Sequence, residues 1–366
     1  MSPHIHSLKT KVKKPTTKGT KADSVEIVTV ADLLPTLEKT DFNLDEQPYS
    51  SLFKIYQKEF LEISVSTVLI HADVLALAGD GTPVVTSHRE RKKRICKCKE
   101  NGIHDCNCDR YFSQPDCDIG WDSSRDCYYH GYDLYMLVDS QSDLPVFPHF
   151  SCASKHDSHG FLHAFFRMKS FLPEYSVSKV LLDSTHDAMP YYQYLKRENI
   201  TPFIDLNGKG GRPPVYKNDF TIDKDGGPIC PSGFRMRRDG VEVAKGRMKF
   251  KCPKISHAGG CISCTCENPC SNAKYGRTVH LVLKDNPRLF NNPPRDSKEW
   301  KLEDNARTST ERSNKREKLD FKLEDGRHRS TMMGYGRLYH ILMLQHLDAW
   351  DLPTEVTQRK LILDVT

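Results

Sequence analysis

Short apolar runs of strand length recur through the middle of the chain, each bounded by turn residues. One covers Val74–Val84, and two more lie within Tyr132–Phe150, joined by the polar sequence DSQSD. Further runs follow at Val177–Asp183 and Thr201–Leu206. Apolar runs bounded in this way predict buried strands, and the polar connection predicts a hairpin. The pattern constrains the chain to a fold built around a sheet.

Segments with helical spacing alternate with these strands. They are Ala31–Lys39, Phe53–Ile63, Phe161–Phe171, Ala188–Glu198 and Met332–Trp350. The order strand, hairpin, helix, strand, helix, strand predicts an α/β fold with a mixed sheet flanked by helices. Two of the strands have an aspartate at or just past their ends, which is where open sheets bind their ligands.

Two stretches interrupt this order. Residues 86–128 are basic and rich in cysteine, and residues 208–299 are rich in Gly, Pro, Cys and basic side chains. Neither keeps a helical or strand period, so we expect both to be insertions into one core spanning residues 71–350. We expect residues 1–70 to form a basic, helical N-terminal region, although no helix-turn-helix pattern is recognisable in them. One interpretation is that this region is an incomplete DNA-binding region. Residues 351–366 are expected to form a C-terminal tail.

Composition narrows the class of protein. The chain has 37% hydrophobic and 28% charged residues and a net charge of +6. These values are typical of a globular, mildly basic protein. No apolar run approaches the roughly 18 residues of a membrane span, and the N-terminus lacks the pattern of a secretory signal. We therefore expect a cytoplasmic protein, nucleoid-associated in a bacterium, with no membrane partner. Thirteen cysteines in a reducing compartment favour thiols or metal ligands over disulfides.

The segment Ala306–Leu319 (ARTSTERSNKREKL) is almost wholly polar but is expected to form a long helix. At about 100° of rotation per residue, Arg307, Glu311 and Lys318 lie within about 40° of one another. An acid flanked by two bases on one stripe is suited to hold a metal ion beside a phosphate. The alternative is simple ion pairing on a solvated helix.

Two aspartates at strand ends are candidates to join this acid. Asp80 stands in GDGT, directly after an apolar run, although a Gly-Asp-Gly sequence is also a good turn. Asp183 stands in LLDSTHD, ahead of a helix. The alternative there is helix capping, which suits Thr185 or Asp187 better than Asp183.

Three further aspartates compete for the same role. Asp139 opens the expected hairpin turn and Asp205 follows a strand, so we interpret both as turn residues. Asp187 is the first substitute should Asp183 prove wrong.

The order of the three candidate acids carries a resemblance. They lie on the first strand, on the fourth strand and on a helix beyond a long insertion. The second and third strands form a hairpin. In this layout the chain resembles insertion-sequence transposases with a DDE active site on a ribonuclease-H-like core. The resemblance is to the group with a Tyr-x₂-Arg-x₃-Glu-x₆-Lys signature. Arg307, Glu311 and Lys318 match its spacing, whereas Asp304 stands where the Tyr belongs.

Other segments resemble the same family, over roughly Val74 to Trp350. HGYDLYMLVDSQSDLPV is similar to its second and third strands, and ASKHDSHGF to the start of its first core helix, where a His-Asp pair is common. LLDSTHDAMPYYQYLKRENITPFIDL is similar to the segment of the second aspartate, with His186 in place of the expected aromatic residue.

The resemblance implies a DNA transposase. Water would attack at the transposon end to free a 3′ hydroxyl, which would then attack target DNA. Asp80, Asp183 and Glu311 would be the catalytic acids and would hold Mg²⁺ or Mn²⁺, ions that prefer hard oxygen ligands. Because acids gathered in a cleft repel one another, we expect raised pKa values there without metal.

The same resemblance implies the partners. Arg307, Lys315 and Lys318 would contact phosphates of the transposon ends and target DNA, and a homodimer would act on paired ends. The helix Ala306–Leu319 would be polar because DNA covers it. Two alternatives stay open. One is another ribonuclease-H-like nuclease, and the other is a decayed transposase that acts only as a zinc-stabilised DNA-binding protein.

The cysteines form two groups. CPKISHAGGCISCTCENPC has zinc-ligand spacing, and its cysteines are Cys252, Cys261, Cys264, Cys266 and Cys270. Four thiolates can close a structural Zn²⁺ site, and the alternative is reduced thiols in a loop-rich insertion. A second, less regular group consists of Cys96, Cys98, Cys106, Cys108, Cys117 and Cys127. Its C-x-C pairs do not easily bind one zinc ion together.

Overall fold

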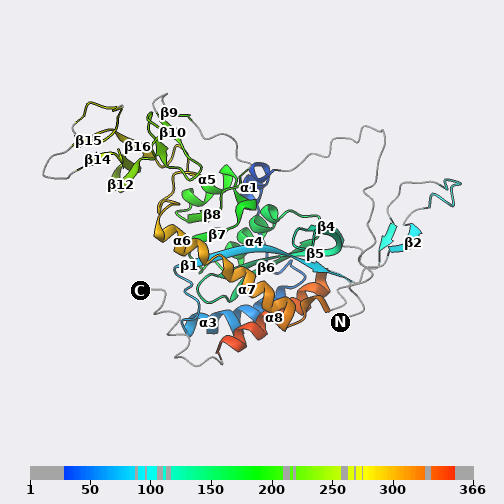
Figure 1. Ribbon diagram of the computed structural model, residues 1–366. Coiled ribbons are helices and arrows are strands. Elements are labelled where there is room, and N and C mark those ends of the chain that lie inside the picture. The colour runs from blue at the N-terminus through cyan, green and yellow to red at the C-terminus, as the bar shows by residue number, and fades with distance from the viewer. Residues whose placement is uncertain are drawn as a thin grey trace.

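A mixed six-stranded sheet forms the centre of the described chain (Figure 1). The computed structural model describes residues 29–86, 90–94, 97–104, 110–112, 117–208, 215–216, 220–256, 263–267, 269–273, 275–325 and 331–350. The strands, in spatial order, are β4 (Asp118–Asp122), β5 (Cys127–Asp139), β1 (Leu75–Val85), β7 (Val177–Leu182) and β8 (Thr201–Ile204), and β6 (Pro145–Cys152) also pairs with β5. The predicted mixed α/β sheet is confirmed.

Strand directions follow from the connections. The hairpin of β5 and β6 is antiparallel, and β5 runs antiparallel to β1. In contrast, β1, β7 and β8 are parallel, because a helix crosses over before each return to the sheet. All five predicted strand runs are confirmed. Their ends differ, since β5 begins at Cys127, before the predicted Tyr132, and β8 ends at Ile204, before the predicted Leu206. Asp80 lies within β1, which continues to Val85.

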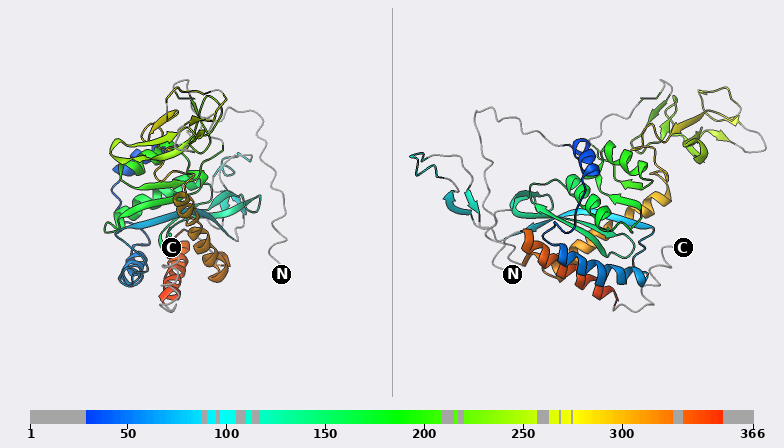
Figure 2. Two further views of the ribbon diagram at one scale, coloured as in Figure 1. Left: turned by 60° about the vertical axis from the view of Figure 1, so that its left-hand side comes forward. Right: turned by 180° about the vertical axis from the view of Figure 1, so that it is seen from behind.

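Helices cover both faces of the sheet (Figures 1 and 2). On one side lie α1 (Val30–Lys39), α4 (Asp157–Phe171) and α5 (Met189–Arg197), and on the other lie α2 (Ser50–Tyr56), α3 (Glu62–Ser66) and α8 (Thr331–Trp350). The predicted helices are confirmed, although the segment expected at Phe53–Ile63 contains a π-helical turn, η2 (Gln57–Leu61). No helix in the described ranges combines the length and apolarity needed to cross a bilayer.

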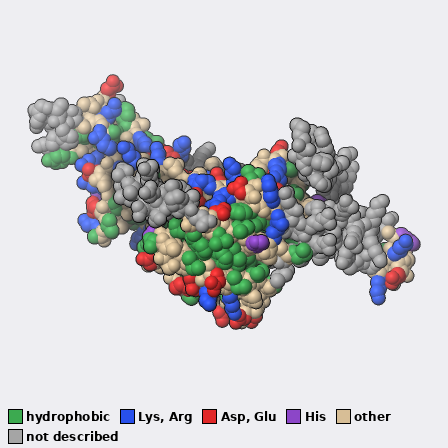
Figure 3. All heavy atoms as spheres, turned by 90° about the horizontal axis from the view of Figure 1, so that it is seen from below, with side chains coloured by type: hydrophobic (Ala, Val, Ile, Leu, Met, Phe, Trp, Pro, Cys, Tyr) green, Lys and Arg blue, Asp and Glu red, His purple; other side chains and the backbone are tan. Residues whose placement is uncertain are grey.

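Aromatic side chains hold α2 and α8 against the sheet. Phe53 of α2 is fully buried and makes edge contacts with Phe147 of β6 and Tyr339 of α8, at ring-centroid distances of 5.5 and 6.2 Å. Tyr335 of α8 accepts the backbone N–H of Phe150 at 2.9 Å. Apolar side chains also gather on the outer surface of these helices (Figure 3), where Ile55 and Leu347 are exposed.

Short strands occupy the two cysteine-bearing stretches. In the first, β2 (Glu90–Arg94) pairs with β3 (Arg110–Phe112), and β4 joins the central sheet, so this part of residues 86–128 belongs to the core. The second contains β9 (Val215–Tyr216), β10 (Phe220–Ile222), β11 (Pro228–Ile229), β12 (Arg237–Glu242), β13 (Arg247–Lys251), β14 (Ile255–Ser256), β15 (Ser263–Cys264) and β16 (Thr278–Val282). These strands form a lobe beyond the end of the sheet (Figure 1) with its own small apolar core. The lysine-rich N-terminal lead and the expected tail, residues 351–366, lie outside the described residues.

Two glycines in α8 provide a matched test of this packing. A Cβ on Gly334 would lie 2.4 Å from the ring of Phe150, whereas a Cβ on Gly336 would meet nothing within 4 Å. Gly334→Ala should therefore lower the free energy of unfolding by about 1–3 kcal/mol through overpacking. Gly336→Ala should raise it by roughly 0.5–1 kcal/mol, because alanine favours the helix. Urea denaturation measures both, and equal effects of the two variants would contradict the packing of α8 on β6.

Candidate active site

The register of two parallel strands places Asp80 beside Asp183. Ala78 and Gly79 of β1 pair with Leu181 and Leu182 of β7, so the next residues along each strand are neighbours, about 4.8 Å apart. Ala78 and Leu181 share an apolar cluster with Trp300. Because side chains two residues apart point to the same face, Asp80 and Asp183 also face this side.

The glycines around Asp80 are needed for close approach, not for a turn. Asp80 lies inside β1, so the alternative that GDGT is simply a turn is wrong. A Cβ on Gly81 would lie 2.2 Å from Oδ1 of Asp157, and one on Gly79 would lie 2.8 Å from the hydroxyl of Tyr135. The two glycines therefore let an acid and a phenol reach the backbone beside Asp80.

The carboxyl group of Asp80 holds its proton unusually tightly. Burial, followed by the charges of Asp183 and Asp157, raises its pKa to about 7, although His186 and Arg307 act in the opposite direction. The expected rise in pKa is therefore confirmed for Asp80. An additional cation at this place would offset the repulsion from Asp183 and Asp157, which adds to the effect of burial.

Asp183 behaves differently because neighbouring side chains and backbone donate hydrogen bonds to its carboxylate. It accepts the backbone N–H and the hydroxyl of Thr185 at 3.1 and 2.7 Å, and its Oδ1 lies 2.6 Å from Nδ1 of His186. Burial opposes ionisation, but hydrogen bonds from His186 and Thr185 lower the pKa of Asp183 to about 2. The expected rise in pKa is wrong here. The alternative that Thr185 or Asp187 caps the following helix is also wrong, because Ala188 is the N-cap of α5 and no side chain caps it. Asp183 instead caps the short turn η3 (Ser184–His186).

His186, at the position where an aromatic residue was expected, links Asp183 to the sheet. Its side chain is completely buried, and its Nε2 lies 2.9 Å from the hydroxyl of Tyr135 on β5. The chain of Asp183, His186 and Tyr135 fixes the carboxylate of Asp183 in place. It also keeps that carboxylate ionised next to a carboxyl group that is half protonated near neutral pH.

The segment that carries Glu311 is not one continuous α-helix. It consists of α6 (Lys298–Asn305), α7 (Thr308–Lys315) and a π-helical turn, η6 (Arg316–Asp320). Trp300 anchors α6, with its ring 4.7 Å from that of Phe203 on β8. In turn, α7 packs against β1 and β5, so Glu311 lies on the side of the sheet that Asp80 and Asp183 face.

Arg307 connects Glu311 to the aspartates. Its Nη1 lies 3.3 Å from Oε1 of Glu311, and its Nε lies 3.8 Å from Oδ2 of Asp205. It also acts on the charge of Asp80. The ion pair expected as the alternative for Arg307 and Glu311 is thus present, and it leaves the Glu311 side chain 55% exposed.

The two lysines of this segment differ in exposure. Lys315 is exposed, whereas the Lys318 side chain is only 17% exposed and its Nζ lies 3.6 Å from Oε1 of Glu324. The charge of Lys318 also acts on Asp133 of β5. Lys318 therefore belongs to a buried charge cluster, not to an open stripe with Arg307 and Glu311.

The inner side of α7 is polar as well as its outer side. The buried residues are Ser309, Thr310, Ser313 and Asn314 of α7, together with Glu317 of the following turn, η6. Glu317 accepts a hydrogen bond from Nε2 of Gln345 at 3.3 Å, and burial raises its pKa to about 8. The explanation that α7 is polar because DNA covers it is therefore wrong for this side, which packs inside the protein.

The competing aspartates have identifiable roles. Asp139 accepts the N–H and hydroxyl of Ser142 at 2.9 and 2.7 Å, so its assignment as a turn residue is confirmed. The Asp187 side chain is fully buried and accepts from Nη2 and Nε of Arg288 at 2.6 and 2.8 Å. It ties the cysteine-bearing lobe to the core and is no substitute for Asp183. Asp205 follows β8 without forming a turn, so its assignment as a turn residue is wrong, and it pairs with Arg307 instead.

Two acids of this region were not predicted. Asp157 at the start of α4 touches the backbone at Gly81, and Asp133 is buried within β5. An aspartate within the apolar run YDLYMLV is a legible signal, because a buried strand rarely admits a charge. The His-Asp pair before α4 was a second signal.

The chemistry of these side chains fits a hard divalent cation. Carboxylate oxygens are the ligands that Mg²⁺ and Mn²⁺ prefer, and the charges of Asp183 and Asp157 add to the effect of burial in raising the pKa of Asp80. Within the described residues, no three His, Cys, Asp or Glu side chains are already arranged to hold an ion. Glu311 in particular would have to leave Arg307.

Comparison with known proteins adds no family. Neither the models of protein families nor the curated proteins contain a match to this chain.

The buried Glu317 gives this region a pH dependence that can be measured. Because its folded pKa is raised to about 8, its favourable contribution is complete below the unfolded pKa and is lost as pH rises through 8. The loss proceeds at about 1.4 kcal/mol per pH unit between the two pKa values. Glu317→Gln keeps a neutral side chain, so its stability should not show this decline.

Urea denaturation between pH 5 and pH 9 compares the two proteins. The stability of Glu317→Gln relative to wild type should increase with pH, while Glu299→Gln at an exposed position of α6 should track wild type. Parallel pH profiles for wild type and Glu317→Gln would show that Glu317 is not buried as described.

Proposed function

We propose that this chain is a DNA transposase of the DDE type, with a ribonuclease-H-like core, that cleaves at transposon ends and transfers strands into target DNA. The observation that carries the proposal is the shared face of Asp80 and Asp183, next to the Arg307–Glu311 pair on α7. These are the residues through which the sequence resembles this family. The spatial order β6, β5, β1, β7, β8 also supports it, because the second and third core strands form the hairpin of that layout.

The two aspartates would bind the metal ions from different protonation states. Asp183 is ionised and fixed by His186, so it needs no rearrangement. Asp80 would exchange its proton for a metal ion, which favours binding above a pH of about 7. Mg²⁺ or Mn²⁺, once bound, would neutralise charge at the phosphate and assist the attacking and leaving oxygens.

Arg307 would act as a substitute cation before DNA arrives. It lies near Asp80 and pairs with Glu311 and Asp205. A metal ion on the acids would release Arg307 toward a backbone phosphate, with which guanidinium forms strong paired hydrogen bonds. Exposed Lys315 would add a second phosphate contact, while Lys318 would contribute only if it left Glu324. The proposal further includes a homodimer on paired DNA ends in a bacterial, nucleoid-associated setting.

Strand cleavage tests the proposal directly. Labelled DNA from both flanks of the gene is incubated with the full chain in Mg²⁺ or Ca²⁺. Cleavage is expected in Mg²⁺ alone. Asp80→Asn, Asp183→Asn and Glu311→Gln should each lower its rate by more than the roughly 10- to 100-fold caused by loss of an outer-shell partner. Glu299→Gln, an exposed glutamate of the neighbouring helix α6, is the matched control and should cleave normally.

Undiminished cleavage by all three variants would end the proposal. DNA binding without cleavage by the wild-type chain would favour the decayed, DNA-binding form. That form has one specific observation in its favour, since Glu311 is bound to Arg307 in a chain with Asp304 at the signature's Tyr position. Cleavage of junctions or nicked DNA without strand transfer would favour another nuclease of the same fold.

A further inference from the structure

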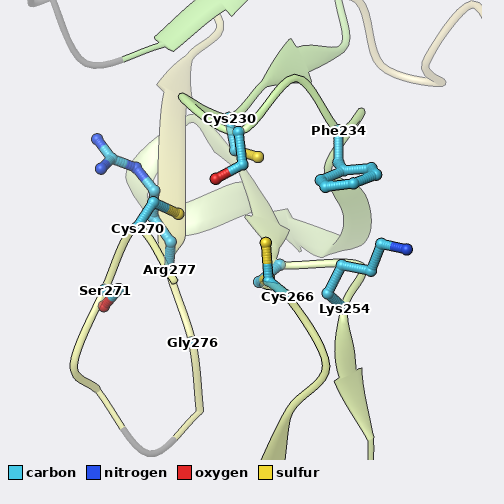
Figure 4. A pocket seen from close by; sticks show the side chains of 10 residues that line it. Cys230, Phe234, Lys254, Cys266, Cys270, Ser271, Gly276 and Arg277 are labelled. Atoms are coloured by element: carbon cyan, nitrogen blue, oxygen red, sulfur yellow. The ribbon is translucent and has the colours of Figure 1, made fainter. Parts of the chain in front are cut away.

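Four cysteines surround one pocket in the lobe formed by β9–β16. They are Cys230, Cys252, Cys266 and Cys270. Cys230 follows β11, Cys252 follows β13, and the other two lie between β15 and β16. Figure 4 shows the sulfur atoms of Cys230, Cys266 and Cys270 directed toward a common space. Residues far apart in the sequence thus bring thiols together.

The backbone holds two of these cysteines in defined turns. The N–H of Cys230 donates to the carbonyl of Phe234 at 2.9 Å, and its own carbonyl accepts from Gly233, which has a φ of +80°. The N–H of Cys252 donates to the carbonyl of Arg277 at 2.9 Å. These bonds hold the backbone of each cysteine without using the thiols.

Gly276 allows the chain to close over Cys252. Its φ is +70°, and a Cβ at this position would lie 2.9 Å from Cβ of Cys252 and 2.6 Å from the Ile255 side chain. Any other residue would push the loop away from the thiol. The approach of the loop therefore belongs to the construction of the pocket.

Two basic side chains lie beside the thiols of the pocket. Lys254 lies 4.4 Å above the ring of Phe234, and Arg277 also lines the pocket. Burial, opposed by the charge of Arg277 and reinforced by the thiols of Cys230 and Cys252, raises the pKa of Cys270. The thiols are thus close enough to influence one another, and two basic side chains lie at the edge of the group.

The lobe has little else to stabilise it. Its buried apolar core consists of Ile222, Cys230, Met236, Met248, Phe250, Val279, Leu281, Leu289 and Phe290. Domains with so small a core usually depend on a metal ion or on disulfides. Binding energy from thiolates becomes folding energy in such domains.

We propose that Cys230, Cys252, Cys266 and Cys270 together bind one structural Zn²⁺ ion. The sulfurs would move from around the pocket to about 2.3 Å from the ion, the usual Zn–S distance. This site differs from the set suggested by sequence spacing, because Cys230 joins it from outside that segment. Cys261 lies outside the described residues, and the Cys264 side chain is not among those described. The site does not depend on the proposed DNA chemistry.

Metal content of the purified full chain tests the site. Zinc should be present, and Cys230→Ser, Cys252→Ser, Cys266→Ser and Cys270→Ser should each lose one equivalent per chain. Cys152→Ser, in β6 of the central sheet, is the matched control and should retain all zinc. Cobalt exchanged into the wild-type chain should show thiolate charge-transfer bands, a readout that does not depend on the folding of any variant.

Three results would overturn the site. One is a wild-type chain without stoichiometric zinc and with no thiolate bands after cobalt exchange. Another is full zinc in Cys230→Ser together with loss in Cys261→Ser or Cys264→Ser, which would restore the set suggested by spacing. The third is a disulfide between any two of the four cysteines, detected by mass spectrometry of the unreduced chain. None of these measurements involves DNA cleavage, so failure of the zinc site and failure of the transposase proposal are distinguishable.

Discussion

The parallel pairing of β1 with β7 brings two carboxyl groups to neighbouring positions on one face of the sheet. Two like charges about one strand spacing apart cannot both ionise easily when partly buried. In this structure the two carboxyl groups have shifted pKa values in opposite directions. Hydrogen bonds from Thr185 and His186 keep Asp183 ionised, and Asp80 keeps its proton up to about pH 7. The charges of Asp183 and Asp157, which add to the effect of burial in raising the pKa of Asp80, also favour a cation at this place.

Arg307 and the helix that follows it depend on this electrostatic arrangement. Arg307 spans Glu311 and Asp205 and acts on Asp80, so one guanidinium lies among three carboxylates. The position of Arg307 depends on the preceding helix α6, whose Trp300 packs against Phe203 of β8. Inward polar side chains, with Glu317 bound to Gln345 of α8, hold α7 from the other side. Glu311 is therefore presented at the edge of the site by a helix that is anchored along its length.

Local pattern was sufficient to predict the elements and the meeting of two acids. Apolar runs with turn residues set the strands, and a parallel crossover from β1 to β7 brings Asp80 and Asp183 to one edge. What local pattern could not provide were contacts between elements remote in sequence. Asp157 lies close enough to act on Asp80 because Gly81 leaves room for its carboxylate at the start of α4.

The same limitation applies to the polar helix and to the cysteines. The polar sequence of α7 predicts a solvated helix on all sides. One side is buried because its polar side chains bond to Gln345, which lies on α8. Cys230 belongs to the thiol pocket through the pairing of short strands in the lobe, and no spacing rule links it to Cys252, Cys266 and Cys270. In both cases a residue's environment was decided by a partner that the local pattern does not contain.

We propose that Asp80, Asp183 and Glu311 share divalent ions. Fe²⁺ can occupy carboxylate sites of this kind, and with ascorbate and peroxide it generates radicals that cut the backbone around the bound ion. The account predicts three cuts in the full chain, near Asp80, Asp183 and Glu311, all suppressed by excess Mg²⁺ and all absent in Asp80→Asn. Cuts near the two aspartates with an intact segment around Glu311 would show that the glutamate does not share the ion, and would contradict the account.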